Sequence, residues 1–239
     1  MKLQNQYRRI SACCLALCCL VQFGQLADAQ DKKPEAEEIF NGKDLTGWEG
    51  DTTLWNVEDG AITGTTKADK PIAHNTFLIW KDGKLGDFEL NLEYRIQGGN
   101  SGIQYRSKVH DAKEFIVGGY QADIDSTMRY TGINYEERGR GILAERGQIV
   151  SISAKGEKKV VGSAGDADAL AGKVDKNGWN RYKIVAQGNK VQHYINDTLM
   201  SEVVDEQKEN AAAEGILALQ LHAGEPMKIQ FRKMQLQKK

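Results

Sequence analysis

The chain has 239 residues, with 32 Lys and Arg against 33 Asp and Glu and a formal net charge of −1. This balance argues against nucleic acid or an anionic membrane surface as a partner. All four cysteines lie between Cys13 and Cys19, close to the N-terminus. Loss of that segment would leave no disulfide, thiolate metal site or cysteine nucleophile.

The N-terminus has the pattern of an export signal. Three basic residues precede an apolar stretch of about fourteen residues at positions 10–23, followed by Ala27-Asp28-Ala29. The stretch is shorter than the roughly twenty residues that span a bilayer. We therefore predict a signal peptide at residues 1–29 and a protein that is periplasmic or secreted, with no membrane span after cleavage. The alternative is a lipoprotein modified at Cys13.

A single domain is expected after the signal. Residues 30–38 are polar and charged, which predicts a short disordered leader. From residue 39 to residue 239 there is no linker, low-complexity run or internal repeat. About 200 residues is a common length for one β-sandwich or barrel.

The apolar residues recur with a period of two along most of this domain. Residues 87–96 alternate strictly, as in a strand with one buried face. Tight hairpin turns are predicted at Asp59-Gly60, Gly188-Asn189 and Asn196-Asp197. The period slips by one residue near Arg232-Lys233, which indicates a β-bulge.

Helical periodicity is nearly absent. Only residues 166–171 and 207–214 could each form a turn or two of helix. Many short antiparallel strands, together with 25 glycines, predict an all-β fold: a two-sheet antiparallel jelly-roll sandwich.

Three predicted strands carry polar side chains opposite their apolar residues. In residues 102–106, 120–125 and 217–222 every second residue is apolar and is expected to face the core. The residues between them are of types that bind sugar hydroxyls by paired hydrogen bonds. If the strands share a sheet, they form one groove; the alternative is an ordinary solvated face. The predicted groove residues are Gln104, Arg106, Gln121, Asp123, Asp125, Gln220 and His222.

Two carboxylates stand out in this set. Asp123 and Asp125 are two residues apart, which places them about 6.6 Å apart at the backbone of a strand. Such a pair can divide acid and base work or share a cation. We therefore consider a divalent metal ion possible, held by Asp123, Asp125 and His222, although the sequence makes no cofactor certain.

A polar, glycine-rich segment at residues 129–141 lies between the second and third of these strands. Its two tyrosines could stack on a sugar ring, and its charged residues could overhang the groove, although a self-neutralising surface loop is the alternative. The residues concerned are Tyr130, Tyr135, Glu136, Glu137, Arg138 and Arg140. In contrast, His193 alternates with apolar residues in a hairpin and is predicted to be structural.

Several blocks of the sequence resemble the 3-keto-disaccharide hydrolase domain family, and the resemblance covers essentially all of residues 39–237. Where many members carry Glu and then Gln two residues on, this chain has Gln121 and Asp123. The matching blocks are Ile39 to Trp48, Trp55 to Gly60, Gly86 to Leu90, Gly98 to Arg106, Gly119 to Asp123, Trp179 to Tyr182 and Leu219 to Gly224.

The resemblance implies a concanavalin-like lectin/glucanase sandwich and an exported protein that acts on glycosides or disaccharides oxidised to a ketone at C3. Such a ketone acidifies the C2 proton, so a base can remove it and expel the C1 substituent, after which water adds back. His222 is the predicted base, with Asp123 and Glu137 as further catalytic residues and Arg106 near the enolate. The residues predicted to bind substrate are Gln104, Arg106, Gln121, Asp125, Tyr135, Arg138, Arg140 and Gln220.

Two other functions stay open at this level. A non-catalytic carbohydrate-binding domain can have the same scaffold, because a fold does not fix a function. Ordinary glycoside hydrolysis by paired carboxylates is the third possibility. The sugar, the linkage and the oligomeric state are not determined by the sequence.

We predict that the exported protein begins at Gln30. Small residues at positions 27 and 29 fit a signal-peptidase site, so mass spectrometry of the exported protein should show this terminus. A terminus at lipid-modified Cys13 would instead show the protein to be a lipoprotein.

Overall fold

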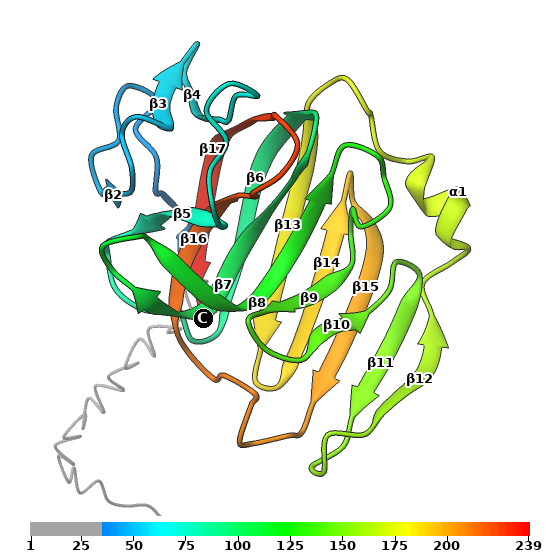
Figure 1. Ribbon diagram of the computed structural model, residues 1–239. Coiled ribbons are helices and arrows are strands. Elements are labelled where there is room, and N and C mark those ends of the chain that lie inside the picture. The colour runs from blue at the N-terminus through cyan, green and yellow to red at the C-terminus, as the bar shows by residue number, and fades with distance from the viewer. Residues whose placement is uncertain (1–34) are drawn as a thin grey trace, which may run out of the picture. The chain divides into compact units, whose positions relative to one another are not determined.

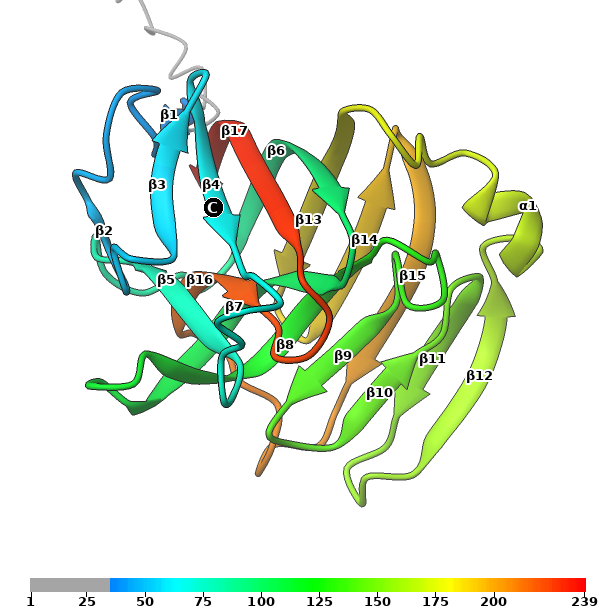
Figure 2. The same ribbon diagram turned by 45° about the horizontal axis from the view of Figure 1, so that its top comes forward.

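The computed structural model describes residues 35–239, which fold into two β-sheets packed face to face, with one short helix (Figure 1). The smaller sheet lies in front of the larger one in Figure 1, and after a turn of 45° it is seen below it (Figure 2). The predicted signal peptide and the first part of the predicted leader lie outside the described residues. Among residues 35–239, no helix is long and apolar enough to cross a membrane.

Within the described chain, the larger sheet has ten strands and the smaller has seven. The larger sheet contains, in spatial order, β12 (Lys158–Ser163), β11 (Gln148–Ile152), β15 (Thr198–Asp205), β14 (Lys190–Ile195), β13 (Asn180–Gln187), β6 (Phe88–Gln97), β17 (Lys228–Lys238), β4 (Ala61–Thr65) and β3 (Trp55–Glu58), with β1 (Glu37–Glu38) paired to β17. The smaller contains β10 (Gly141–Ala144), β9 (Asn134–Glu137), β8 (Ile116–Asp125), β7 (Asn100–Asp111), β16 (Ile216–Leu221), β5 (Thr76–Trp80) and β2 (Trp48–Glu49).

The apolar faces of the two sheets form the core. Along β6, Phe88, Leu90 and Leu92 are buried and alternate with half-buried polar residues, as the sequence predicts. Tyr105 of β7 and Tyr120 of β8 enter the same core from the smaller sheet and stack with ring centroids 5.7 Å apart. The prediction of an all-β two-sheet sandwich is confirmed, with β11 and β15 as a parallel pair in an otherwise antiparallel arrangement of the described strands.

The predicted turns occur where the sequence places them. Hairpins join β3 to β4, β13 to β14 and β14 to β15, and Asp59, Asn196 and Asp197 adopt the positive φ angles that such turns require. The pairing of β17 with β6 shifts register between Arg232 and Gln235, where Lys233 has a φ of 51°. The predicted bulge is therefore confirmed.

The helix predictions have a mixed outcome. The helix α1 (Ala167–Ala171) forms, and the Asp166 side chain caps it by accepting from two backbone N–H groups. Residues 207–214 form turns rather than a helix, so that prediction is wrong. The end of the predicted leader is ordered, because Glu37 and Glu38 pair with Gln235 and Leu236 of β17.

His193 lies within the core with no exposed surface, in agreement with the structural role predicted for it. Its Nδ1 is 3.1 Å from the carbonyl oxygen of Ile133, which can only accept, so Nδ1 carries the proton. Its Nε2 then accepts from the Tyr105 hydroxyl at 2.8 Å. Burial lowers the pKa of this imidazole to about 4.

We predict that His193 makes the fold sensitive to acid. Its pKa is about 4 in the folded state against 6.5 for the free side chain, so below pH 6.5 the unfolded chain binds the proton more readily. The neutral His193 side chain therefore makes its full contribution to the free energy of unfolding above pH 6.5. That free energy falls by up to about 3 kcal/mol by pH 4. Chemical denaturation between pH 6.5 and pH 4 should show that the free energy of unfolding falls less steeply with pH in His193→Gln than in the native protein. An identical pH dependence in the two proteins would contradict the assignment.

Candidate functional site

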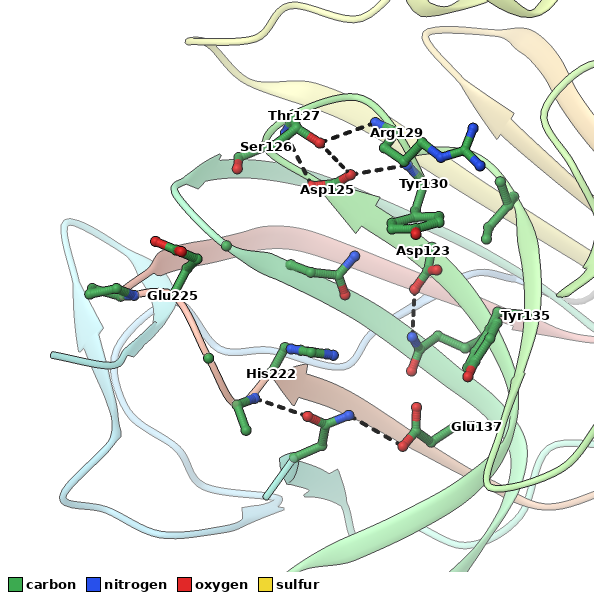
Figure 3. A pocket seen from close by; sticks show the side chains of 18 of the residues that line it. Asp123, Asp125, Ser126, Thr127, Arg129, Tyr130, Tyr135, Glu137, His222 and Glu225 are labelled. Atoms are coloured by element: carbon green, nitrogen blue, oxygen red, sulfur yellow. Dashed lines mark hydrogen bonds between the residues drawn. The ribbon is translucent and has the colours of Figure 1, made fainter. Parts of the chain in front are cut away.

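A cavity of about 980 Å³ lies over the face of the smaller sheet that is turned away from the core (Figure 3). Asp123 on β8 and Tyr135 and Glu137 on β9 project into it from the strands. One wall is the segment that follows β8, with Arg129 and Tyr130, and the loop after β16, with His222, bounds another side.

The base of the cavity is a chain of hydrogen bonds that runs in one direction. The Ser107 hydroxyl donates to Gln104 Oε1 at 2.6 Å, and Gln104 Nε2 donates to Gln121 Oε1 at 2.6 Å. Gln121 Nε2 donates in turn to Asp123 Oδ1 at 2.5 Å. We call these four side chains the amide relay. Each amide uses its oxygen to accept and its nitrogen to donate, so the relay ends on the Asp123 carboxyl.

A second set of amides converges on Glu137. Asn75, just before β5, donates from Nδ2 to Glu137 Oε1 at 3.2 Å, while Gln220 Nε2 lies 3.5 Å from Glu137 Oε2. Asn75 also accepts the backbone N–H of Ala223 at 2.9 Å, which ties down the loop that begins at His222. One amide thus fixes both a cavity carboxylate and the loop of the predicted base.

Gln104 and Gln220 therefore have a different place from the one predicted. Both face away from the core, as the alternation indicates, but neither has any exposed surface. They lie beneath the cavity and orient Gln121, Asp123 and Glu137 through the bonds described above. The prediction that they contact substrate directly is wrong for this reason.

Asp123 is a buried carboxyl without a cation. Only 5% of its surface is exposed, and among residues 35–239 no Lys, Arg or His forms an ion pair with it. Burial, together with the negative charges of Glu137 and Asp125, raises its pKa from 3.8 to about 8, and the hydrogen bond from Gln121 offsets only part of this. Perturbed carboxyls of this kind are concentrated at functional sites.

Asp125 is not part of the reactive set, although it lies at the edge of the cavity. Its carboxylate accepts hydrogen bonds from the Thr127 N–H at 3.1 Å, the Thr127 hydroxyl at 2.8 Å and the Tyr130 N–H at 3.1 Å. It thereby holds the cavity wall that carries Arg129 and Tyr130. Three acceptor positions of Asp125 are thus taken by Thr127 and Tyr130, and its pairing with Asp123 as a substrate or cation site stays a prediction.

Arg106 is also placed elsewhere. The strand bulges here, Arg106 has a φ of 47°, and the register of β7 against β8 shifts between Tyr105 and Lys108. The guanidinium is therefore turned to the edge of the sandwich, where it donates to Gly86 O, Gly188 O and Asp87 Oδ1. The prediction that Arg106 lies in the groove, near a developing enolate, is wrong.

The alternation along β9 separates the charged residues of the predicted overhanging loop. Tyr135 and Glu137 face the cavity, whereas Glu136 faces the other way and pairs with Arg140 at 2.6 Å. Arg140 also binds the buried Asp205 at 2.7 Å, so it stabilises the sandwich and does not reach the cavity. Arg138 is exposed in the β9–β10 turn, outside the cavity lining. Arg140 is thus committed to Glu136 and Asp205, while the substrate-binding role of Arg138 stays a prediction.

Arg129 and Asn75 are cavity residues that the sequence did not single out. Arg129 lies with its guanidinium 5.4 Å from the centre of the Tyr130 ring, and Tyr130 is 39% exposed although it is aromatic. The only sequence signal for Arg129 was its position in the polar loop, and Asn75 gave no signal, because it precedes an ordinary apolar strand.

His222 follows the last residue of β16 and is exposed, and its imidazole points into the cavity (Figure 3). Within residues 35–239 it makes no hydrogen bond or ion pair, so both ring nitrogens are accessible to a ligand. The structure thus places His222, Asp123 and Glu137, the three predicted catalytic residues, around one cavity.

The predicted metal ligands do not gather into a site. In the described part of the chain, no three side chains of His, Cys, Asp or Glu are arranged so that they could hold a metal ion. The oxygens of Asp125 are occupied by Thr127 and Tyr130, as described above.

Comparison with protein families identifies the domain. Residues 35–237 match the model of the 3-keto-alpha-glucoside-1,2-lyase-like domain. The chain belongs to this family. The family resemblance stated from the sequence blocks is confirmed. A search of curated protein sequences found no match for this chain.

Solved structures share the fold of this 3-keto-glucoside lyase-like domain. A Parabacteroides distasonis protein provisionally described as a glycosyl hydrolase is 18% identical, with a TM-score of 0.57 over 86% of this chain and 100% of that chain. A carbohydrate-binding module (CBM66) from Bacillus subtilis is 17% identical, with a TM-score of 0.51 over 80% and 94%. A Bacillus licheniformis β-glucanase is 11% identical, with a TM-score of 0.51 over 86% and 99%. At these identities the likeness establishes the fold.

We predict that neutralising Asp123 stabilises the protein, whereas neutralising Asp125 destabilises it. Native Asp123 keeps its proton up to about pH 8 while the unfolded side chain loses it near 3.8, so stability falls as the pH rises between these values. Asp123→Asn removes that loss and keeps the acceptor for Gln121, which should raise the free energy of unfolding at pH 8 by about 2 kcal/mol or more.

The matched variant Asp125→Asn places an NH₂ group against donors and should lower the free energy of unfolding by about 1–3 kcal/mol. Urea denaturation of the two variants at pH 8 checks both values. Equal destabilisation by both would show that Asp123 is an ordinary ionised carboxylate.

Proposed function

We propose that this protein is exported and cleaves glycosides that carry a ketone at C3, by proton abstraction from C2 and elimination of the C1 substituent, followed by addition of water. The observation that carries the proposal is the convergence of His222, Asp123 and Glu137 on one cavity of a 3-keto-alpha-glucoside-1,2-lyase-like domain. The cavity of about 980 Å³ is within the range of small-molecule sites.

The reaction needs one base and a stabilised enolate. The base takes the C2 proton, and the electron pair of the C2–H bond forms the C2–C3 double bond while the C3 carbonyl oxygen becomes negative. When the carbonyl re-forms, the C1–C2 double bond appears and the C1–oxygen bond breaks, and the leaving oxygen takes up a proton. Water then adds at C1, which completes the net hydrolysis.

His222 is the proposed base. Its imidazole enters the cavity from the loop after β16 and has no competing partner in residues 35–239, and the Asn75–Ala223 hydrogen bond holds that loop at the cavity. Glu137, fixed by Asn75 and Gln220, is proposed to accept hydrogen bonds from sugar hydroxyls. Tyr130 and Tyr135 offer aromatic faces beside it.

A non-catalytic carbohydrate-binding domain is the second candidate. It is favoured by one observation, the exposed Tyr130 ring, whose backbone N–H is bound by Asp125 and whose face contacts Arg129, because exposed aromatic platforms can bind sugars without reaction. The Bacillus subtilis module shares the fold. This candidate predicts affinity for sugars with no turnover and no loss of the C2 proton.

We predict that His222→Gln reduces turnover of a 3-keto-glucoside by at least about a hundredfold, since a general base contributes roughly 10²–10⁴ to rate. The rate of C2 hydrogen exchange in D₂O, measured by NMR, should fall in parallel, while the melting temperature stays unchanged. The control His110→Gln removes an exposed imidazole from β7 outside the cavity and should leave both rates intact.

The same assay separates the alternatives. Normal exchange in His222→Gln but loss of exchange in Glu137→Gln would make Glu137 the base. If the native protein binds sugars and neither keto-glycosides nor their unoxidised counterparts react, the binding-domain reading replaces this proposal. Turnover of the unoxidised glycoside alone would indicate ordinary glycoside hydrolysis.

A further inference from the structure

The two cavity carboxyls differ in how many donors the protein gives them. Glu137 is approached by amide groups at both oxygens, from Asn75 and from Gln220. Asp123 receives one amide, from Gln121 at Oδ1, and Oδ2 has no donor in the described part of the chain. Hydrogen bonds to a carboxylate favour its charged form, and Asp123 has fewer of them than Glu137.

Burial acts in the same direction. Asp123 is 5% exposed beside two acidic groups, and these surroundings raise its pKa to about 8. At neutral pH it is therefore mainly a carboxylic acid, and its Oδ1 is occupied by Gln121. The remaining Oδ2–H is a hydrogen-bond donor for whatever fills the cavity.

Tyr135 provides a second neutral donor in the same cavity. Its position on β9 pairs with Gln121 on β8, and its side chain lines the same cavity as Asp123. Burial, followed by the charges of Glu137 and Asp123, raises the pKa of its hydroxyl, so the phenol keeps its proton. Within residues 35–239 no side chain or backbone group accepts this hydroxyl.

We propose that the protonated carboxyl of Asp123 and the hydroxyl of Tyr135 form an oxyanion hole that stabilises the enolate at C3. This inference rests on the proposed function. A developing enolate needs donors fixed in advance, and neutral O–H groups in a site shielded from water provide them. Arg106, the residue expected to do this from the sequence, is bound to Gly86, Gly188 and Asp87 at the edge of the sandwich.

The role differs from that of a base, because Asp123 and Tyr135 donate hydrogen bonds and keep their protons. Negative charge moves from the C2–H bond to the C3 oxygen and then to the leaving oxygen, while the C2 proton goes to His222. The amide relay fixes the Asp123 carboxyl in one orientation, so its donor is in place before the substrate arrives.

The test compares variants that keep or remove the donors. Asp123→Asn retains an N–H at the position of Oδ2, so kcat on a 3-keto-glucoside should stay within about tenfold of the native value, whereas Asp123→Ala and Tyr135→Phe should each lose about 10²–10³ in kcat with little change in KM. Tyr194→Phe, on β14 of the other sheet, is the matched control and should retain activity.

The pH profile gives a signature that a structural role would not produce. Native kcat should fall as the pH rises through about 8, since ionised Asp123 loses its donor and repels the enolate, and this fall should be absent in Asp123→Asn. The infrared band of a protonated carboxyl should be present at pH 6, disappear by pH 10, and be missing in Asp123→Asn.

The outcomes separate the two proposals. A native enzyme that is active while Asp123→Asn is folded but at least about a hundredfold slower would make Asp123 a base and overturn this inference alone. Full activity of Tyr135→Phe, or an unchanged alkaline limb in Asp123→Asn, would overturn it as well. A native protein that leaves keto-glycosides intact would overturn the proposed function first, and this inference with it.

Discussion

The cavity depends on one constraint: a row of polar side chains is buried on the outer face of a sheet and has to satisfy its own hydrogen bonds. The amide relay meets this requirement by passing each donor to the next acceptor until it reaches Asp123. The relay needs space beneath it, which Gly102 provides. A Cβ at that position would lie 2.5 Å from Cδ of Gln121, so a side chain there would displace the central amide.

The orientation of these amides determines the electrostatics of the site. Because Glu137 receives two donors and Asp123 one, the two carboxyls have unequal environments although they face the same cavity. Environments that separate the protonation states of neighbouring carboxyls are how enzymes assign different roles to identical groups. Here the pKa of Asp123 is raised first by burial and then by the charges of Glu137 and Asp125, and no charged residue of the described chain pairs with it.

The walls of the cavity are held by hydrogen bonds, like the strand residues at its floor. Asp125 binds the backbone of the segment that carries Tyr130, and Arg146 donates to the carbonyl oxygens of Met128 and Thr131 at 2.7 Å each. Asn75 holds the opposite loop through Ala223. The fold is shared with a glucanase and with a carbohydrate-binding module, so chemistry specific to this family has to come from these loops and from the strand residues they cover.

The sequence by itself determined the period-two strands, the hairpin turns, the bulge in β17, the short helix near residues 166–171 and the family, because alternation, turn residues and sequence blocks are local properties. It also determined that Gln121 and Asp123 face away from the core. Only the tertiary structure decided which polar residues reach the cavity. A bulge turned the Arg106 side chain away from the cavity. Alternation along β9 placed Glu137 in the cavity and Glu136 on the opposite face. The Asp125 carboxylate binds the loop that follows β8. Partners distant in the sequence, such as Asn75 and Glu137, meet only through folding. Burial and hydrogen-bond partners, which fix the charge of Asp123, are not encoded at any single position.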